Sequence, residues 1–110
     1  MTLEERIQAA VTPIVAECVP GIYTGEADEY CTFTCTEIPD GHGDNRPHCI
    51  RSLCQVHWFL PLKRRPYEKQ KRLRNALAAV PGFTAPTVTP AADDIGQHYV
   101  FEFEALEGGF

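Results

Sequence analysis

Apolar residues recur with helical spacing in two segments of this chain. The first follows Thr2, which fits a capping box with Glu5, so that each side chain satisfies a free backbone amide at a helix start. Its apolar stripe consists of Leu3, Ile7, Ala10, Val11, Ile14 and Val15. The second begins at Tyr67, ends before Pro81, and has a stripe made of Leu73, Ala76, Leu77 and Val80. Both segments are predicted to be amphipathic helices, and Pro13 is expected to kink the first or split off its last turn.

The longest apolar run, residues 49–60, predicts the central strand of a sheet. It is rich in β-branched and aromatic residues, and no turn former interrupts it. Apolar side chains occur on both of its faces, which is typical of a strand that is at least partly covered on both sides. Residues 30–36 alternate between polar and apolar positions and predict another strand, with three side chains facing the core: Cys31, Phe33 and Cys35.

Shorter segments complete the predicted sheet. Residues 22–24 are expected to be a short extended piece. Residues 83–89 contain Pro86, which favours a strand near a sheet edge. Residues 97–105 alternate clearly and are expected to form an antiparallel hairpin with that strand. Residues 39–47 are dense in turn formers and predict an exposed connector.

This order of segments predicts an α+β fold. We expect a mixed, mostly antiparallel sheet with two helices packed on one face, in the order α-β-β-β-α-β-β. With 110 residues, of which 44% are hydrophobic, residues 1–110 are expected to form a single domain. The apolar runs are too short to cross a bilayer, and the first residues lack the pattern of a signal peptide. We therefore expect a soluble, non-exported protein without a membrane partner.

The five cysteines raise the question of a metal site: Cys18, Cys31, Cys35, Cys49 and Cys54. The spacings Cys31-x3-Cys35 and Cys49-x4-Cys54 do not match the CxxC knuckle of zinc sites. Two strand residues four apart are roughly 13 Å from each other, too far to share one ion. We therefore expect reduced thiols that pack as small hydrophobic residues, with no metal and no other cofactor. A zinc protein stays open as an alternative that metal analysis would decide.

No motif in the sequence is typical of an enzyme. It contains no Gly-rich phosphate loop after a strand, no HExxH and no GxSxG. His57 could act as a general base, but no Ser, Cys or carboxylate stands in a recognisable nucleophile pattern with it. A hydrogen-bonded core histidine is favoured instead. The sequence therefore predicts a non-enzymatic protein with no catalytic residues.

Charge is unevenly distributed along the chain. The net charge is -5, yet seven of the ten basic residues fall between Lys63 and Arg74. The candidate contacts of this basic segment, with an acidic partner surface or a phosphate backbone, are Lys63, Arg64, Arg65, Lys71, Arg72 and Arg74. The acidic candidates precede it and are Glu26, Asp28, Glu29, Asp40 and Asp44. A plain solvated helix face remains the alternative explanation for the basic segment.

Four stretches of the sequence resemble the small tail-terminator, or tail-completion, proteins of long-tailed bacteriophages and prophages. They are TLEERI at 2–7, YTGEADEY at 23–30, QVHWFLP at 55–61 and GQHYVFEFE at 96–104. The resemblance spans nearly the whole chain. It implies a structural protein that forms a ring, typically a hexamer, which caps the tail tube, stops its polymerisation and meets the head-side connector.

The resemblance also implies partners and a location. The partners would be further copies of this chain, the major tail protein and the head-tail connector proteins, in the virion tail and, during assembly, in the host cytoplasm. The acidic loops of one subunit could face the basic segment of its neighbour, a head-to-tail contact that can close into a ring. The cations could instead line the ring lumen and contact DNA nonspecifically. A related head-tail completion protein, or a monomeric adaptor that recognises an acidic partner through residues 63–74, remains open.

Overall fold

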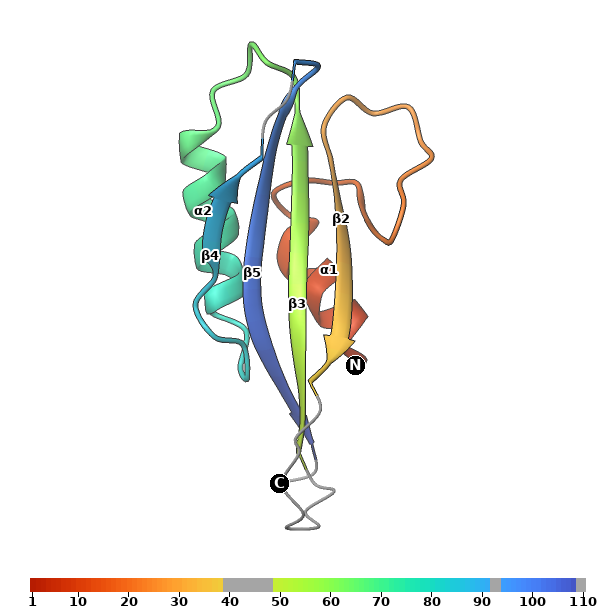
Figure 1. The fold of residues 1–110 in the computed structure, drawn as a ribbon, viewed down its shortest axis with the longest axis vertical. Coiled ribbons are helices and arrows are strands. Elements are labelled where there is room, and N and C mark those ends of the chain that lie inside the picture. The colour runs from red at the N-terminus through yellow and green to blue at the C-terminus, as the bar shows by residue number, and fades with distance from the viewer. Residues whose placement is uncertain (39–48, 92–93, 109–110) are drawn as a thin grey trace.

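The long strand β3 (Cys49–Leu60) is the centre of a single five-stranded sheet (Figure 1). The computed structural model describes residues 1–38, 49–91 and 94–108. The strand order is β1-β2-β3-β5-β4, and the other strands are β1 (Cys18–Pro20), β2 (Tyr30–Glu37), β4 (Thr87–Pro90) and β5 (Gln97–Gly108). β1 pairs with β2 in parallel, and the remaining three pairings are antiparallel.

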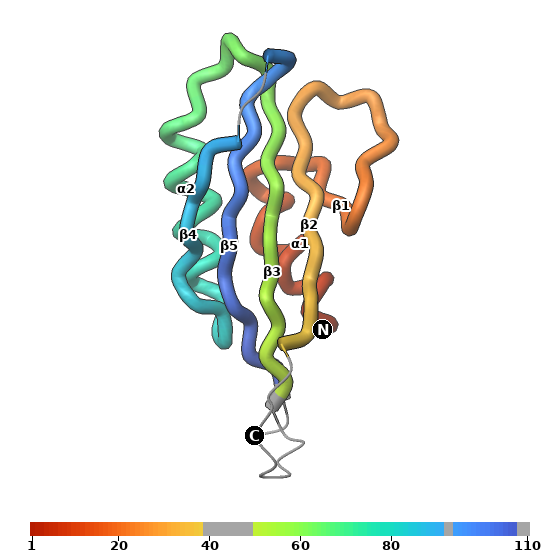
Figure 2. The backbone as a smooth tube through the Cα atoms, viewed as in Figure 1, coloured from red at the N-terminus to blue at the C-terminus, as the bar shows by residue number. Residues whose placement is uncertain are grey.

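Two helices, α1 (Leu3–Val11) and α2 (Tyr67–Ala78), pack on the same face of the sheet. Figure 2 shows α1 behind β2 and β3, and α2 behind β4 and β5. The predicted α+β fold, its element order and its mostly antiparallel mixed sheet are therefore confirmed. The loop predicted at 39–47 lies outside the described residues.

The capping box at the start of α1 forms as predicted. The Glu5 amide donates to Thr2 Oγ1 at 3.1 Å, and the Thr2 amide donates to Glu5 Oε1 at 2.9 Å. Hydrogen bonds from the Thr2 amide and the Thr2 hydroxyl to the Glu5 carboxylate lower the pKa of Glu5, because they stabilise the charged form. The helix ends at Val11, because Pro13 has no amide hydrogen with which to continue the hydrogen-bond ladder.

The turn that follows α2 requires a glycine at position 82. Gly82 has a φ of 90°, a conformation that side-chain-bearing residues rarely adopt. A Cβ at this position would lie 2.7 Å from the carbonyl oxygen of Leu106, whose amide donates to Gly82 O at 2.8 Å. Arg6 of α1 donates to the carbonyl of Pro81, and its guanidinium lies 5.1 Å from the ring centroid of Phe83. The two helices are thereby tied together where α2 ends.

The core lies between the helices and one face of the sheet. The even-numbered residues of β3 from Ser52 to Leu60 are buried in it, and Trp58 is fully buried. The predicted stripes are buried at Leu3, Ile7 and Val11 in α1 and at Leu73 and Leu77 in α2. Val15 is also buried, but it lies in the turn after α1 and not in the helix. Within the described residues, no helix is long and apolar enough to span a membrane.

Three details of the predicted sheet are wrong. The first strand is Cys18–Pro20, so residues 22–24 are not part of the sheet. The strand predicted at 83–89 begins only at Thr87, because Phe83 makes a single isolated bridge to Ala105. Cys35 shares its face with buried residues but is exposed, because it lies beside the first residues of α1, where the helical cover of the sheet ends.

Candidate interaction surface

The cations of the basic segment divide into two groups in the structure. Leu73 and Leu77 of α2 are buried against the core. The exposed cations of the same helix, Lys71, Arg72 and Arg74, therefore face outward. Five exposed cations make no ion pair with any described acidic residue, and we call them the basic patch: Lys63, Arg65, Lys71, Arg72 and Arg74. The patch is a fixed surface, because its helix is anchored to the core by its two leucines.

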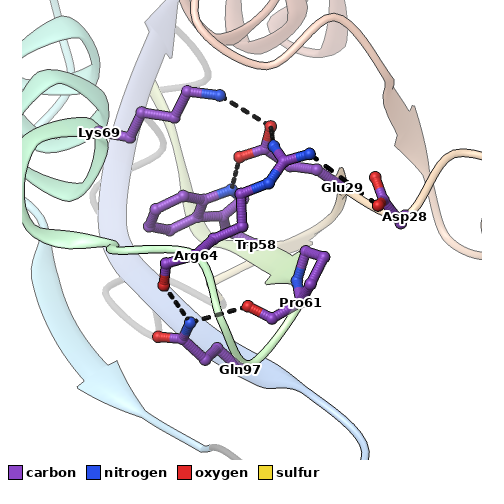
Figure 3. A network of polar contacts seen from close by, with 7 residues as sticks. All are labelled: Asp28, Glu29, Trp58, Pro61, Arg64, Lys69 and Gln97. Atoms are coloured by element: carbon purple, nitrogen blue, oxygen red, sulfur yellow. Dashed lines mark hydrogen bonds and ion pairs between the residues drawn. The ribbon is translucent and has the colours of Figure 1, made fainter.

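The other group is engaged inside the chain, around the carboxylate of Glu29 (Figure 3). Lys69 Nζ lies 2.7 Å from Glu29 Oε1, and Arg64 Nη1 lies 3.7 Å from the same oxygen. The indole Nε1 of Trp58 donates to Glu29 Oε2 at 3.1 Å. The Glu29 side chain is only 13% exposed, and a carboxylate this sheltered is stable when it is paired and hydrogen-bonded. Glu29 and Arg64, both candidate interface residues, therefore make contacts within their own chain.

The loop that leads into α2 is held by one amide side chain. Gln97 Nε2, at the start of β5, donates to the carbonyl oxygens of Pro61, Leu62 and Arg64 at 2.9, 3.2 and 2.6 Å. Two of these contacts are drawn in Figure 3. The side chains of the basic patch thus project from a loop and a helix that are both fixed in place.

A hollow of about 270 Å³ lies beside the basic patch. Its lining includes Arg64, Arg65, Lys69 and Arg72, together with the carboxylates of Glu29 and Glu68. Cations therefore outnumber carboxylates around it by two to one. An acidic side chain from another molecule is the group that this hollow suits best, because it would meet the exposed guanidinium groups of Arg65 and Arg72.

The acidic candidates that the structure describes lie on the segment 21–29. This segment loops outward beside β2 (Figure 1), and its last residues reach the loop before α2 and α2 itself through Arg64 and Lys69. Glu26 is exposed, and the Asp28 side chain is 71% exposed with Arg64 Nη2 at the long distance of 4.0 Å. Asp40 and Asp44 lie outside the described residues.

A row of stacked aromatic rings holds the segment 21–29 against the face of the sheet opposite the helices. Ring centroids are 4.3 Å apart for Tyr23 and Tyr30, 4.8 Å for Tyr30 and Phe59, and 4.2 Å for Phe59 and His98. The Tyr23 hydroxyl also accepts a hydrogen bond from the Ala27 amide at 2.9 Å. The position of Glu26 and Asp28 therefore depends on side chains that sequence patterns do not connect.

His57 lies on this same open face. It is half-buried, and its Nε2 donates to Gln55 Oε1 at 3.3 Å, so its Nδ1 accepts from His98 Nε2 at 2.9 Å. Burial lowers the pKa of His57, because it disfavours the imidazolium form. No serine, cysteine or carboxylate contacts this imidazole in the described part of the chain, and the interpretation of His57 as a general base gains no support from its contacts.

The described residues contain no group of three or more histidine, cysteine or acidic side chains that could hold a metal ion.

Sequence reasoning missed three features of this surface: the role of Glu29 within the chain, the loop contacts of Gln97, and the His57–His98 pair. Each joins residues at least 29 positions apart, so no local pattern signals it. Comparison with models of known protein families and with curated proteins found no match for this chain.

Proposed function

We propose that this protein is a ring-forming structural subunit of a long-tailed phage or prophage particle, of the tail-terminator kind. The likeness of residues 2–7, 23–30, 55–61 and 96–104 to such proteins supports this proposal. In this role the ring caps the tail tube, contacts the major tail protein on one side and meets the head-tail connector on the other.

The observation that carries the proposal is the unneutralised basic patch. Five exposed cations on a fixed helix and loop have no described acidic partner within their own chain, so they are free to bind an acidic surface elsewhere. Glu26 and Asp28 are exposed on the segment 21–29, whose last residues lie beside Arg64 and Lys69. Exposed cations on one element and exposed carboxylates on another allow a head-to-tail contact between copies, which closes into a ring when the rotation per subunit allows it.

The proposed contact uses fewer residues than the sequence suggested. Glu29 is sheltered and paired with Arg64 and Lys69, so the contact is assigned to the basic patch on one copy and to the exposed Glu26 and Asp28 on the next, although Asp28 also lies 4.0 Å from Arg64 of its own chain. Asp40 and Asp44 stay predicted members of the acidic side. The hollow beside Arg65 and Arg72 is the place where a carboxylate of the neighbour would insert.

A charge-swap experiment tests this contact. The basic variant Lys71→Glu, Arg72→Glu, Arg74→Glu and the acidic variant Glu26→Lys, Asp28→Lys are each expected to be monomeric by sedimentation. A chain that carries all five substitutions regains opposite charges on its two contact surfaces and is expected to assemble again. The matched control Lys71→Arg, Arg72→Lys, Arg74→Lys keeps every charge and is expected to assemble like the wild type.

The outcome separates the ring from the two other uses of the same cations. If the cations line a lumen and contact DNA, the basic variant remains oligomeric and loses only DNA retention. If the protein is a monomeric adaptor for an acidic partner, the wild type is monomeric as well and binds that partner one to one. Either result would contradict the proposed contact between copies.

A further inference from the structure

Two cysteines face each other across neighbouring strands. Cys35 of β2 and Cys54 of β3 are direct partners in the antiparallel register, and their Sγ atoms are 3.5 Å apart. Directly opposite residues in antiparallel strands have Cα atoms about 4.5 or 5.5 Å apart. A disulfide spans Cα separations of about 4.4 to 6.8 Å. A bond between these two sulfurs is therefore compatible with the strand pairing as it stands.

The two thiols differ in access and in acidity. Cys54 is fully buried, whereas Cys35 is exposed in an open hollow of about 450 Å³. The Cys54 thiol donates a hydrogen bond to Cys35 Sγ, which stabilises the Cys35 thiolate and lowers the pKa of Cys35. The same hydrogen bond, together with burial, raises the pKa of Cys54 and keeps it protonated. Cys35 is thus the thiol that reacts first, and Cys54 is the one that can resolve the product.

The surroundings of Cys35 select the kind of oxidant. The hollow is lined by three carboxylates, those of Glu4, Glu37 and Glu107. Like charges repel, so an anionic reagent such as glutathione disulfide is disfavoured in this hollow. A small neutral oxidant meets no such repulsion, and hydrogen peroxide fits this description.

We propose that Cys35 and Cys54 form a peroxide-sensitive redox site, separate from the proposed assembly contact. The Cys35 thiolate attacks one peroxide oxygen, an S–O bond forms, the O–O bond breaks, and the departing hydroxide takes a proton to become water. The resulting sulfenic acid is then attacked by Cys54, which loses its proton as the S–S bond forms and a second water leaves. Each sulfur loses one electron, and the peroxide gains two.

The expected consequence is a covalent link between β2 and β3. It would close the chain from residue 35 to residue 54 into a loop, and such a link stabilises the folded state by restricting the unfolded chain. The oxidised protein is therefore expected to melt at a higher temperature than the reduced protein, and a dithiol reductant should reverse the change.

Peptide mapping tests the site directly. The reduced full chain is treated with hydrogen peroxide, and the remaining thiols are alkylated. The protein is then digested, without reduction, with proteases that cleave on the C-terminal side of acidic and basic residues. We expect peptide 30–37 to be linked to peptide 52–63 through Cys35 and Cys54, and the intact chain to lose two hydrogen atoms. In the variant Cys54→Ala the sulfenic acid at Cys35 should persist and be trapped by dimedone. Glutathione disulfide at the same concentration should form the link more slowly than peroxide.

A relocated thiol provides the matched control. The double variant Cys35→Ser, Thr36→Cys moves an exposed thiol by one position, opposite Leu53 instead of Cys54. Peroxide is expected to give no link to Cys54 and no rise in melting temperature in this variant. If Cys54→Ala does not fold, Cys35→Ser serves instead, since it changes an exposed side chain and should abolish the link. The proposal is overturned if folded wild-type protein keeps both thiols alkylatable after peroxide, or if Cys35 links to another cysteine or another chain.

Discussion

At the scale of single residues, the carboxylate of Glu29 joins three separate parts of the chain. It receives a hydrogen bond from Trp58 in the sheet and pairs with Lys69 on α2 and Arg64 in the preceding loop. Because Glu29 is sheltered from solvent, its loss leaves cations and a buried indole N–H with poorer partners. This residue is the one most responsible for fixing the basic segment against the sheet.

Replacing Glu29 is therefore expected to destabilise the protein. The variant Glu29→Gln should lower the free energy of unfolding by about 1–3 kcal/mol, since a charge-assisted, largely buried contact is lost. The neighbouring change Asp28→Asn is the matched control, and because Asp28 is exposed its effect should stay within about 0.5 kcal/mol. Urea denaturation of the two variants measures the difference. Equal effects would mean that the Glu29 network contributes nothing specific.

His57 is expected to make stability depend on pH in the mildly acidic range. Burial depresses the pKa of His57 in the folded chain below its unfolded value of about 6.5. The unfolded state then binds more protons as the pH falls, so this contribution is complete above about pH 6.5 and is lost as the pH drops toward the folded pKa. Protonation would also disrupt the Nδ1 contact with His98.

Thermal melting between about pH 7.5 and 5.5 tests this role of His57. The wild type should lose more of its melting temperature over this interval than the variant His57→Asn, which cannot titrate there. Parallel pH profiles for the two proteins would be incompatible with a depressed pKa at this position.

At the scale of elements, the segment 21–29 depends on its contact with the sheet. It has no strand pairing of its own, and Tyr23 holds it by stacking on Tyr30 and by accepting the Ala27 amide hydrogen bond. Gly25 allows this arrangement, because a Cβ there would lie 2.2 Å from the Tyr23 hydroxyl oxygen. Tyr23 thus helps to position the exposed acidic residues of the segment, together with the contacts of Arg64 and Lys69 at its end.

Removing the Tyr23 hydroxyl should loosen the segment while leaving the ring stack intact. The variant Tyr23→Phe is expected to cost about 0.5–1.5 kcal/mol and to speed hydrogen exchange at the Ala27 amide. Tyr67→Phe makes the same chemical change at a side chain that is 78% exposed, and it should leave both quantities unchanged. An Ala27 amide that exchanges equally fast in wild type and Tyr23→Phe would count against this view of the segment.

The elements themselves could be predicted because local patterns determine them. The capping box at Thr2, the helical stripes and the alternation of residues 97–105 are all readable over a few positions. The alternation places Cys35 on the core-facing side of its strand, but it does not reveal how far α1 covers that side, and Cys35 is exposed. The Glu29 network and the Cys35–Cys54 pair join different elements, so they follow only from the register and packing of the sheet.

At the scale of the whole molecule, exposed charges of opposite sign lie on different elements. The basic patch projects from α2 and the loop before it, and Glu26 and Asp28 are on the segment that extends from the β2 side. Among the residues that the structure describes, Arg64 and Lys69 are the cations that pair with acidic residues of that segment. The proposed ring uses the exposed charges of the basic patch and of Glu26 and Asp28. Its contacts are solvent-exposed ion pairs, and the screening length of salt at moderate ionic strength is about 8 to 10 Å.

Sedimentation of the wild-type chain, at high protein concentration and in low and then high salt, tests the proposed ring most directly. We predict one discrete species at low salt with a mass several times that of a single chain, and dissociation toward single chains as salt is added, because screening weakens contacts between exposed charges. A single-chain mass at low salt and high concentration would contradict the proposal that copies of this protein bind one another through the basic patch.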